Sequence, residues 1–276
     1  MEHTLASDST ATTQLTRSGT ATDLAPESSL ARGLRVLTHL ALAGRPLGVT
    51  ELAHHFGVPK SNMHRHLNTL VGQGFATRLA GGRYRASLKL WQLGLATYNS
   101  LGIVRLARPA LDELVGASEE TVHLSVLDKH DVLYVDKIDS PQPVRAYSSL
   151  GGRAPAHCVA TGKVLLAHLD PARLDALIGN GLARHSSQTI MDAGPFRAHL
   201  AQIRAAGFAV NRGEWREDVY GLAAPIRDAA GTVVAAVGIS GPKQRLGERR
   251  LKQLTPFVKQ AARRIEAALA GQELAA

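Results

Sequence analysis

The chain has 276 residues, of which 45% are hydrophobic, with one cysteine and a formal net charge of +9. This length and composition allow one large domain or two ordinary ones. The single cysteine, Cys158, excludes an intrachain disulfide and a multi-cysteine metal site, and no apolar run reaches the roughly 18 residues that a membrane-spanning helix needs. We therefore expect a globular, cytoplasmic protein without a membrane partner.

The N-terminal end differs from the rest in composition. Residues 1–28 are rich in Ser and Thr, carry four acidic groups against one basic group, and lack the apolar core of a secretion signal, so we predict a disordered arm. Residues 29–102, in contrast, carry nine Lys or Arg against one acid, Glu51. Such a concentration of positive charge is typical of a module that meets a polyanion, and an ordinary basic surface is the alternative.

The basic segment contains three successive helical patterns. Ser29 is expected to cap the first and Thr50 the second, and the third runs from a cap at Ser61 to about Gly74. Gly57 ends the second helix, and a tight turn follows it. Two short helices joined in this way predict a helix-turn-helix.

The third helix separates into two faces, because each residue advances about 100° around the axis. The apolar side holds Met63, Leu67, Leu70 and Val71. The polar side holds Ser61, Arg65 and Asn68, with Asn62 and Thr69 beside them. These polar groups can pair with base edges and phosphates in the major groove, so this is a candidate recognition helix; a solvated face is the alternative.

Two histidines of this helix, His64 and His66, resemble a metal clip. Residues two apart on a helix point about 200° away from each other, so the pair cannot converge on one metal. We place His64 at the margin of the polar face and His66 among the packing residues. On the second helix, His54 is expected at the surface and His55 partly buried, and no metal site is predicted.

The segment after the third helix, FATRLAGGRYRAS, predicts two short strands around a turn at Gly81 and Gly82. A ribbon in this position is a wing, whose arginines can contact the DNA backbone or the minor groove. A plain surface hairpin is the alternative. The predicted DNA contacts are Thr50, Lys60, Ser61, Asn62, His64, Arg65, Asn68, Arg78, Arg83 and Arg85.

The remaining two-thirds of the chain mix helices and strands. We predict a linker helix over 87–102 and a second helix from 103 to about 117, with Pro109 marking a break or a new start. Strands are expected at 121–128, 131–139, 143–150, 208–213, 219–228 and 232–240, and helices at 157–169, 170–178, 194–207 and about 246–270. This order favours an α+β domain with an antiparallel sheet.

Two places in this part are candidate sites. Cys158 lies beside His157, but neighbours on a helix diverge by about 100°, so we do not expect a ready Cys-His nucleophile. We expect instead that Cys158 is buried or lines a ligand cavity. Gly238 and Ser240 share one face of a predicted strand, and Gly221 also lacks bulk. A ligand pocket and close packing both explain these small residues.

The chain resembles the IclR family of bacterial transcriptional regulators from about residue 29 to residue 270. The segments that carry the resemblance are PKSNMHRHLNTLVGQG, GGRAPAHCVATGKVLLAHL, GFAVNRGEW, GLAAPIRDAAG and VVAAVGISGP. The resemblance implies a winged helix-turn-helix at 29–86, a linker helix at 87–102, and a GAF-like effector-binding and oligomerisation domain at 103–276. It also implies a homodimer or a dimer of dimers on double-stranded DNA with a partly palindromic operator.

The family's effector pocket carries over onto the loop from Gly152 to Cys158 and onto four later positions, which are Asn211, Gly221, Gly238 and Ser240. Asn211 stands where aspartate is frequent, Gly221 where cysteine is frequent and Gly238 where serine occurs. We therefore expect a roomier pocket for a bulkier carboxylate, an aromatic one among the choices. The candidate effector residues are Arg145, Gly152, Arg153, His157, Cys158, Asn211, Glu214, Trp215, Gly221, Gly238 and Ser240, with Arg145, Arg153 and His157 as anion partners.

The sequence thus favours a DNA-binding regulator controlled by a small organic effector, with no catalysis and no cofactor. One alternative is a DNA-binding redox sensor or enzyme acting through Cys158, which requires a reactive thiolate. The other is a structural DNA-binding protein that takes no ligand.

Overall fold

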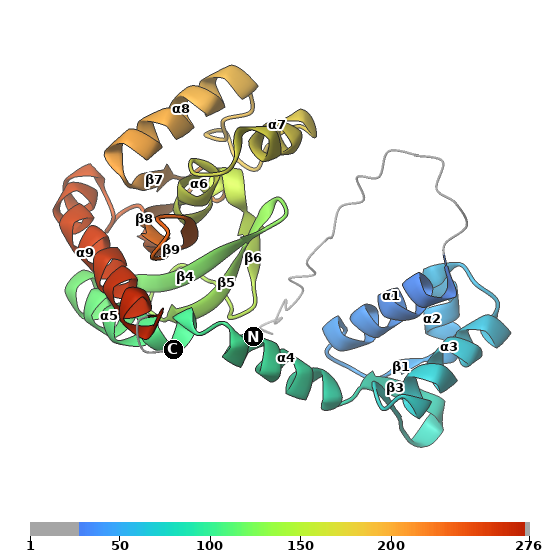
Figure 1. Cartoon of the computed structure of the whole chain (residues 1–276). Coiled ribbons are helices and arrows are strands. Elements are labelled where there is room, and N and C mark those ends of the chain that lie inside the picture. Colours follow the sequence, from blue (N-terminus) through green and yellow to red (C-terminus); the bar gives the residue numbers. More distant parts are fainter. Residues whose placement is uncertain (1–27, 274–276) are drawn as a thin grey trace, which may run out of the picture. The chain divides into compact units, whose positions relative to one another are not determined.

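The computed structural model describes residues 28–273, with side chains up to Gly271 (Figure 1). The arm predicted over residues 1–28 lies outside this part of the chain except for Ser28. The described residues form two compact units, one ending at Gly94 and the other beginning at Leu95. No helix in the described part is long and apolar enough to cross a membrane.

The first unit is a winged helix-turn-helix. Its elements are α1 (Ser29–Leu42), β1 (Leu47–Gly48), α2 (Val49–Phe56), α3 (Lys60–Gly72), β2 (Ala76–Arg78) and β3 (Arg83–Ala86). The three strands form an antiparallel sheet in the order β1-β3-β2. Met63 and Leu67 of α3 are fully buried with Leu52 of α2 and Tyr84 of β3, which confirms the apolar side predicted for the third helix.

All three predicted caps are wrong. Ser28, not Ser29, caps α1, because its side-chain oxygen accepts the N–H of Ala31 at 3.1 Å. Thr50 lies inside α2, since β1 pairs with β3 only as far as Gly48 and the helix follows at once. Ser61 is the second residue of α3, because Pro59 has the extended backbone that precedes that helix.

The second unit is an α+β domain. Its helices are α5 (Ile103–Ser118), α6 (Ala160–Leu166), α7 (Pro171–Gly179), α8 (Ala193–Ala206) and α9 (Glu248–Glu273), and α4 (Lys89–Ser100) spans the boundary between the units. Its strands are β4 (Thr121–Asp128), β5 (Asp131–Ile138), β6 (Arg153–Pro155), β7 (Ala209–Arg212), β8 (Val219–Arg227) and β9 (Val233–Pro242). They form one antiparallel sheet in the order β6-β5-β4-β9-β8-β7. The helix α5 continues through Pro109 without a break.

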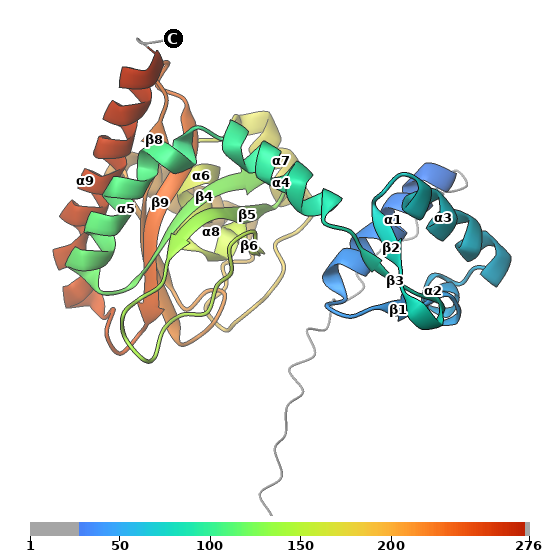
Figure 2. The ribbon, with the colours of Figure 1, turned by 90° about the horizontal axis from the view of Figure 1, so that it is seen from below.

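Helices cover both faces of this sheet. Helices α5 and α9 lie side by side on one face, and α6 with α8 packs on the other (Figure 2). Because side chains alternate along a strand, Leu222 and Ala224 of β8 belong to the core under α5 and α9, whereas Ala223 belongs to the core under α6 and α8. The described unit therefore has two hydrophobic cores separated by one sheet.

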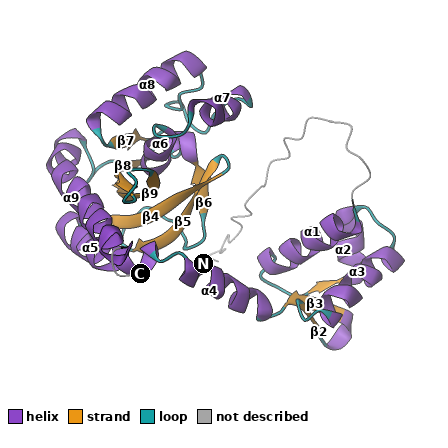
Figure 3. Cartoon of the chain, viewed as in Figure 1, coloured by secondary structure: helices purple, strands orange, loops and turns teal. Residues whose placement is uncertain are grey.

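Two predictions for this unit are wrong. No strand forms at 143–150, and the short β6 pairs with β5 instead (Figure 3). Pro143, at the start of this segment, lacks the N–H group that a strand residue would donate. The helix predicted over 157–169 begins only at Ala160, and a 3₁₀ turn (Ala156–Cys158) precedes it.

Candidate functional site

The polar side of α3 is open to solvent. Ser61, Arg65 and Asn68 are exposed, and Asn62 is half-buried. Arg65 Nη2 donates to Asn62 Oδ1 at 3.3 Å, which orients the guanidinium along the helix. A planar guanidinium and side-chain amides presented by a helix after a tight turn can pair with base edges.

The histidines of this unit do not form a metal site among the described residues. His64 is exposed, whereas His66 is 6% exposed and lies against Gly33 of α1, as the helix geometry predicted. His54 and His55 are both exposed, so the partly buried position expected for His55 is wrong. His55 stacks on His39 with ring centroids 4.0 Å apart, because α1 runs alongside α2 there.

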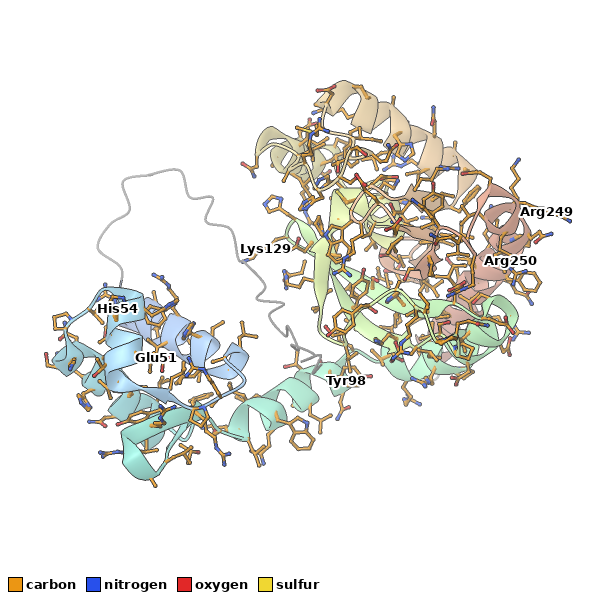
Figure 4. The ribbon with its side chains drawn as sticks, turned by 180° about the vertical axis from the view of Figure 1, so that it is seen from behind. Glu51, His54, Tyr98, Lys129, Arg249 and Arg250 are labelled. Atoms are coloured by element: carbon orange, nitrogen blue, oxygen red, sulfur yellow. The ribbon has the colours of Figure 1, made fainter. Side chains whose placement is uncertain are left out.

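The one acid of residues 29–102, Glu51, is neutralised by a neighbour. Its carboxylate forms an ion pair with Arg45, and this contact holds the pKa of Glu51 below its usual range. Figure 4 shows Glu51 and His54 on α2. This pairing offsets the one negative charge among the nine Lys and Arg of residues 29–102.

The hairpin β2–β3 carries exposed arginines. Tyr84 is 1% exposed, and its neighbours Arg83 and Arg85 point to the opposite, solvent-facing side of β3. Arg83 Nη1 donates to Pro46 O at 3.2 Å, which fixes the wing to the loop before β1. Arg78 on β2 is exposed as well, so all three predicted wing arginines are available to a phosphate backbone.

The second unit contains a small cavity on the α6 side of its sheet. Strand register places Asn211, Gly221 and Ser240 in one row across β7, β8 and β9. The cavity has a volume of about 40 Å³, which is enough to hold water. It is lined by His123, Tyr134, Ala146, Tyr147, Ser148, Val159, Ala160, Thr161, Asn211, Trp215, Arg216, Val219, Gly221, Ile239 and Ser240.

A loop before β6 closes this cavity. His123 Nε2 and Ser148 Oγ are 2.8 Å apart, and Lys137 Nζ donates to Ser148 O at 2.6 Å. Burial, with a smaller effect of the Lys137 charge, lowers the pKa of His123 to about 3, so this ring is neutral. The neighbouring Tyr147 is 75% exposed although it also lines the cavity, which shows that the loop forms the outer wall.

Arg216 is the single Lys or Arg among the lining residues of this cavity. Its guanidinium carbon lies 4.6 Å from the centroid of the Trp215 ring. Asn211 is held in place on both sides: its Oδ1 accepts the N–H of Glu214 at 3.0 Å and its Nδ2 donates to Val219 O at 3.3 Å. Sequence reasoning missed Arg216, although it follows two residues, Glu214 and Trp215, that were selected.

Four of the predicted effector residues line the cavity: Asn211, Trp215, Gly221 and Ser240. Seven do not: Arg145, Gly152, Arg153, His157, Cys158, Glu214 and Gly238. Arg153 instead pairs with Asp128 at 2.5 Å and Asp131 at 3.2 Å, and Arg145 faces Asp139 at 3.6 Å. Two of the three proposed anion partners, Arg145 and Arg153, are thus already compensated by carboxylates.

Gly238 does not enlarge the cavity. A Cβ at this position would meet Leu222 O at 2.7 Å and Ala223 Cβ at 2.9 Å, so the close-packing interpretation is the correct one here. Gly152 is similar, because a Cβ would meet Ser149 O at 2.7 Å. Gly221 is different: it lines the cavity, and a Cβ there would meet its nearest atom, Ile239 O, at 3.1 Å. Of the two glycines among the three substitutions, Gly221 lines the cavity and Gly238 does not, and the roomier pocket expected from the substitutions stays a prediction.

Cys158 is fully buried. Burial, with the charge of Glu214, raises the pKa of its thiol to about 12, against smaller opposing effects of Lys163 and Thr189. A protonated, buried thiol is a poor nucleophile. His157 Nε2 donates to Ala183 O at 2.9 Å, so this nitrogen cannot accept the thiol proton. The geometry argues against an enzyme or redox sensor acting through Cys158.

An exposed polar helix face, a basic wing and a separate domain with a cavity define a DNA-binding regulator of the winged-helix class. The IclR helix-turn-helix domain model matches residues 29–80, and the model of the bacterial transcriptional regulator IclR C-terminal domain matches residues 95–267. The chain belongs to the IclR family of transcriptional regulators, and its relatives are regulators, not enzymes.

Individual relatives agree with this assignment. The HTH-type transcriptional regulator KdgR of Escherichia coli is 33% identical over 225 residues, covering 81% of this chain and 86% of that protein. A transcriptional regulator of Rhodococcus sp. RHA1 is 30% identical with a TM-score of 0.75, over 87% of this chain and 97% of that one. An IclR homologue from Microbacterium hydrocarbonoxydans, solved with 4-hydroxybenzoate, is 28% identical with a TM-score of 0.76, over 88% and 99% of the two chains.

Proposed function

We propose that operator binding by this regulator is controlled by a small organic carboxylate with a compact, aromatic body. The observation that carries the proposal is the pairing of one cation with an apolar, aromatic cavity wall. Arg216 supplies the cation, and Tyr134 and Trp215 supply rings. Charge-assisted hydrogen bonds from a guanidinium to a carboxylate are among the stronger polar contacts in proteins.

The neutral polar groups of the cavity suit the rest of such a molecule. Ser240, Asn211 and the uncharged His123 can donate or accept hydrogen bonds without adding a second charge. The solved relative with 4-hydroxybenzoate is a precedent for a ring that bears a carboxylate and a hydroxyl. An aromatic acid needs more room than about 40 Å³, so the loop that carries Tyr147 and Ser148 moves outward when it binds.

Recognition of DNA uses α3 and the wing in this proposal. The ten predicted DNA contacts are exposed, apart from the half-buried Asn62. A dimer presents two such helices to two half-sites of a partly palindromic operator, and the effector changes the population of the conformation whose spacing matches the operator. The exposed apolar side chains of Leu30 and Leu34 on α1 and of Trp91 on α4 are available for contacts between protomers.

The experiment is a ligand screen on the full chain with two readouts, thermal stability and operator affinity. Benzoate and 4-hydroxybenzoate are expected to raise the melting temperature and to change operator affinity, whereas pyruvate and the uncharged benzamide are not. In Arg216→Gln the response to benzoate is lost. The control Arg173→Gln, an exposed arginine on α7, keeps it. A response to pyruvate alone, or an unchanged response in Arg216→Gln, would refute the proposal.

A further inference from the structure

Three side chains that commonly bind metals lie together outside the cavity lining. His157 and Cys158 come from the 3₁₀ turn before α6, and His185 comes from the loop between α7 and α8. One ligand atom of each lies within 4.8 Å of the ligand atoms of the other two. Nowhere else in the described part of the chain do three His, Cys, Asp or Glu side chains gather in this way. From this arrangement we propose that His157, Cys158 and His185 bind one Zn²⁺ ion.

The distances need only a small adjustment. Zn–S and Zn–N bonds of about 2.3 and 2.0 Å in a tetrahedron place the ligand atoms about 3.5 Å apart. The three atoms therefore have to approach one another by little more than 1 Å from their separation of at most 4.8 Å. His185 is exposed, so its side chain can rotate towards the buried pair at low cost, and it lies where an ion can enter from solvent.

The loop that carries His185 is fixed in position. The backbone N–H groups of His185 and Ser186 donate to Thr189 Oγ1 at 3.0 and 2.9 Å, and Thr189 Oγ1 donates to Glu214 O at 2.7 Å. Ser186 Oγ donates to the same carbonyl at 3.1 Å. The backbone of the third ligand is thus held near the other two before any ion binds, which reduces the entropy lost on binding.

The tautomer of His157 suits metal binding. Because Ala183 O can only accept a hydrogen bond, His157 Nε2 must carry the proton in their 2.9 Å contact. Nδ1 then holds the lone pair that a metal needs. Histidine ligands of metals usually donate their other ring N–H to a carbonyl or carboxylate in this way.

Cys158 binds as a thiolate, so the ion must displace its proton. The S–H bond breaks, an S–Zn bond forms, and the proton goes to solvent. Burial raises the pKa of this thiol to about 12, and the affinity for Zn²⁺ is therefore expected to increase with pH. With three protein ligands, a tetrahedral ion keeps a fourth position for water. A set of one thiolate sulfur and two imidazole nitrogens favours zinc over magnesium or calcium, which prefer oxygen ligands.

The test uses the full chain without an affinity tag, freed of metal with a chelator and titrated with Co²⁺ as a spectroscopic substitute for Zn²⁺. We expect one Co²⁺ per chain, a thiolate-to-cobalt charge-transfer band, and displacement of the band by Zn²⁺. Calorimetry with Zn²⁺ in buffers of different ionisation enthalpy should show release of one proton. The proposal is overturned if no such band forms at saturating Co²⁺.

Variants separate the three ligands from neighbouring histidines. His185→Ala changes an exposed side chain and is expected to weaken Zn²⁺ binding on the order of 100-fold with an unchanged melting temperature. Cys158→Ser removes the charge-transfer band. His130→Ala is the matched control, because His130 is exposed and its carbonyl accepts the N–H of Ala156, yet it is outside the cluster. Equal Zn²⁺ affinity in His185→Ala and the native chain would overturn the proposal.

Discussion

Lys163 of α6 and Glu214 of the loop after β7 form a buried ion pair in the second unit. Nζ of Lys163 donates to both carboxylate oxygens, at 2.5 and 2.6 Å, and to Val210 O at 2.7 Å. Lys163 is fully buried, and Glu214 is 7% exposed. The backbone N–H of Glu214 donates to the side chain of Asn211, which lines the cavity. The backbone carbonyl of Glu214 accepts hydrogen bonds from the hydroxyls of Ser186 and Thr189. This pair therefore joins α6 to both candidate sites of the domain.

Removing one partner of this pair should destabilise the domain strongly. Lys163→Met leaves the Glu214 carboxylate buried without a counter-charge, and we expect a loss of about 3–5 kcal/mol in the free energy of unfolding. The double variant Lys163→Met/Glu214→Gln should lose less, because the uncompensated charge is gone. Urea unfolding followed by Trp215 fluorescence in a Trp91→Phe background measures both. Equal losses of unfolding free energy in the single and double variants would contradict an energetic coupling between Lys163 and Glu214.

His123 should make stability depend on pH. Its pKa is about 3 in the folded chain, chiefly because it is buried, and 6.5 is its ordinary value. Between these values the unfolded chain binds one more proton than the folded chain, so this contribution to stability is fully present above about pH 6.5 and is lost as pH falls. The expected loss is about 1.4 kcal/mol per pH unit.

The measurement is the difference in unfolding free energy between the native chain and His123→Gln at several pH values. Other histidines whose pKa is lowered, such as His199 and His168, cancel in this difference. The difference should shrink steadily from pH 6.5 to pH 4.5. His130→Gln, at an exposed position, serves as the control, and a constant difference for His123→Gln would show that His123 is not the group responsible.

Arg65 should contribute to DNA binding and not to folding. Arg65→Ala is expected to weaken operator binding by about 1–3 kcal/mol, roughly 5- to 150-fold, because a guanidinium contact to a base edge is lost. Arg249→Ala is the matched control, since Arg249 is exposed on α9 of the other unit (Figure 4). Gel-shift titration at fixed salt gives both affinities. If the two variants bind equally well, α3 does not present the reading face.

Arg85 should act on DNA in a sequence-independent way. Because it is an exposed residue of the wing, Arg85→Ala is expected to weaken binding to operator and random DNA by similar factors. The slope of log affinity against log salt should fall by about 1, as one phosphate contact is lost. Fluorescence anisotropy over a salt series tests this, and an unchanged slope would exclude a phosphate contact by Arg85.

Gly238 should tolerate no side chain. Because a Cβ would lie 2.7 Å from Leu222 O, Gly238→Ala is expected to destabilise the domain by about 1–3 kcal/mol. Gly116→Ala, in an exposed turn of α5 with no atom near the new Cβ, should instead stabilise it by about 0.5–1 kcal/mol. Thermal unfolding distinguishes the two outcomes. A neutral Gly238→Ala would mean that the sheet and Thr161 adjust at little cost.

The DNA-binding face could be predicted because its determinants are local. The 3.6-residue period separates Met63 and Leu67 from Arg65 and Asn68 within one helix, and alternation along a short strand separates Tyr84 from Arg85. Element ends were less predictable. The cap of α2 shifted to Gly48 because β1 pairs with β3, a contact between residues far apart in the chain.

The sequence by itself therefore determined the winged helix-turn-helix, the antiparallel α+β domain and the family, since helix period, strand alternation and short motifs are properties of adjacent residues. Only the tertiary structure decided which side chains meet. Strand register and loop anchoring bring Arg216 and His123 to one cavity and His185 to Cys158, while carboxylates from the β4–β5 turn engage Arg153. Such pairings depend on contacts between distant segments, which no local pattern encodes.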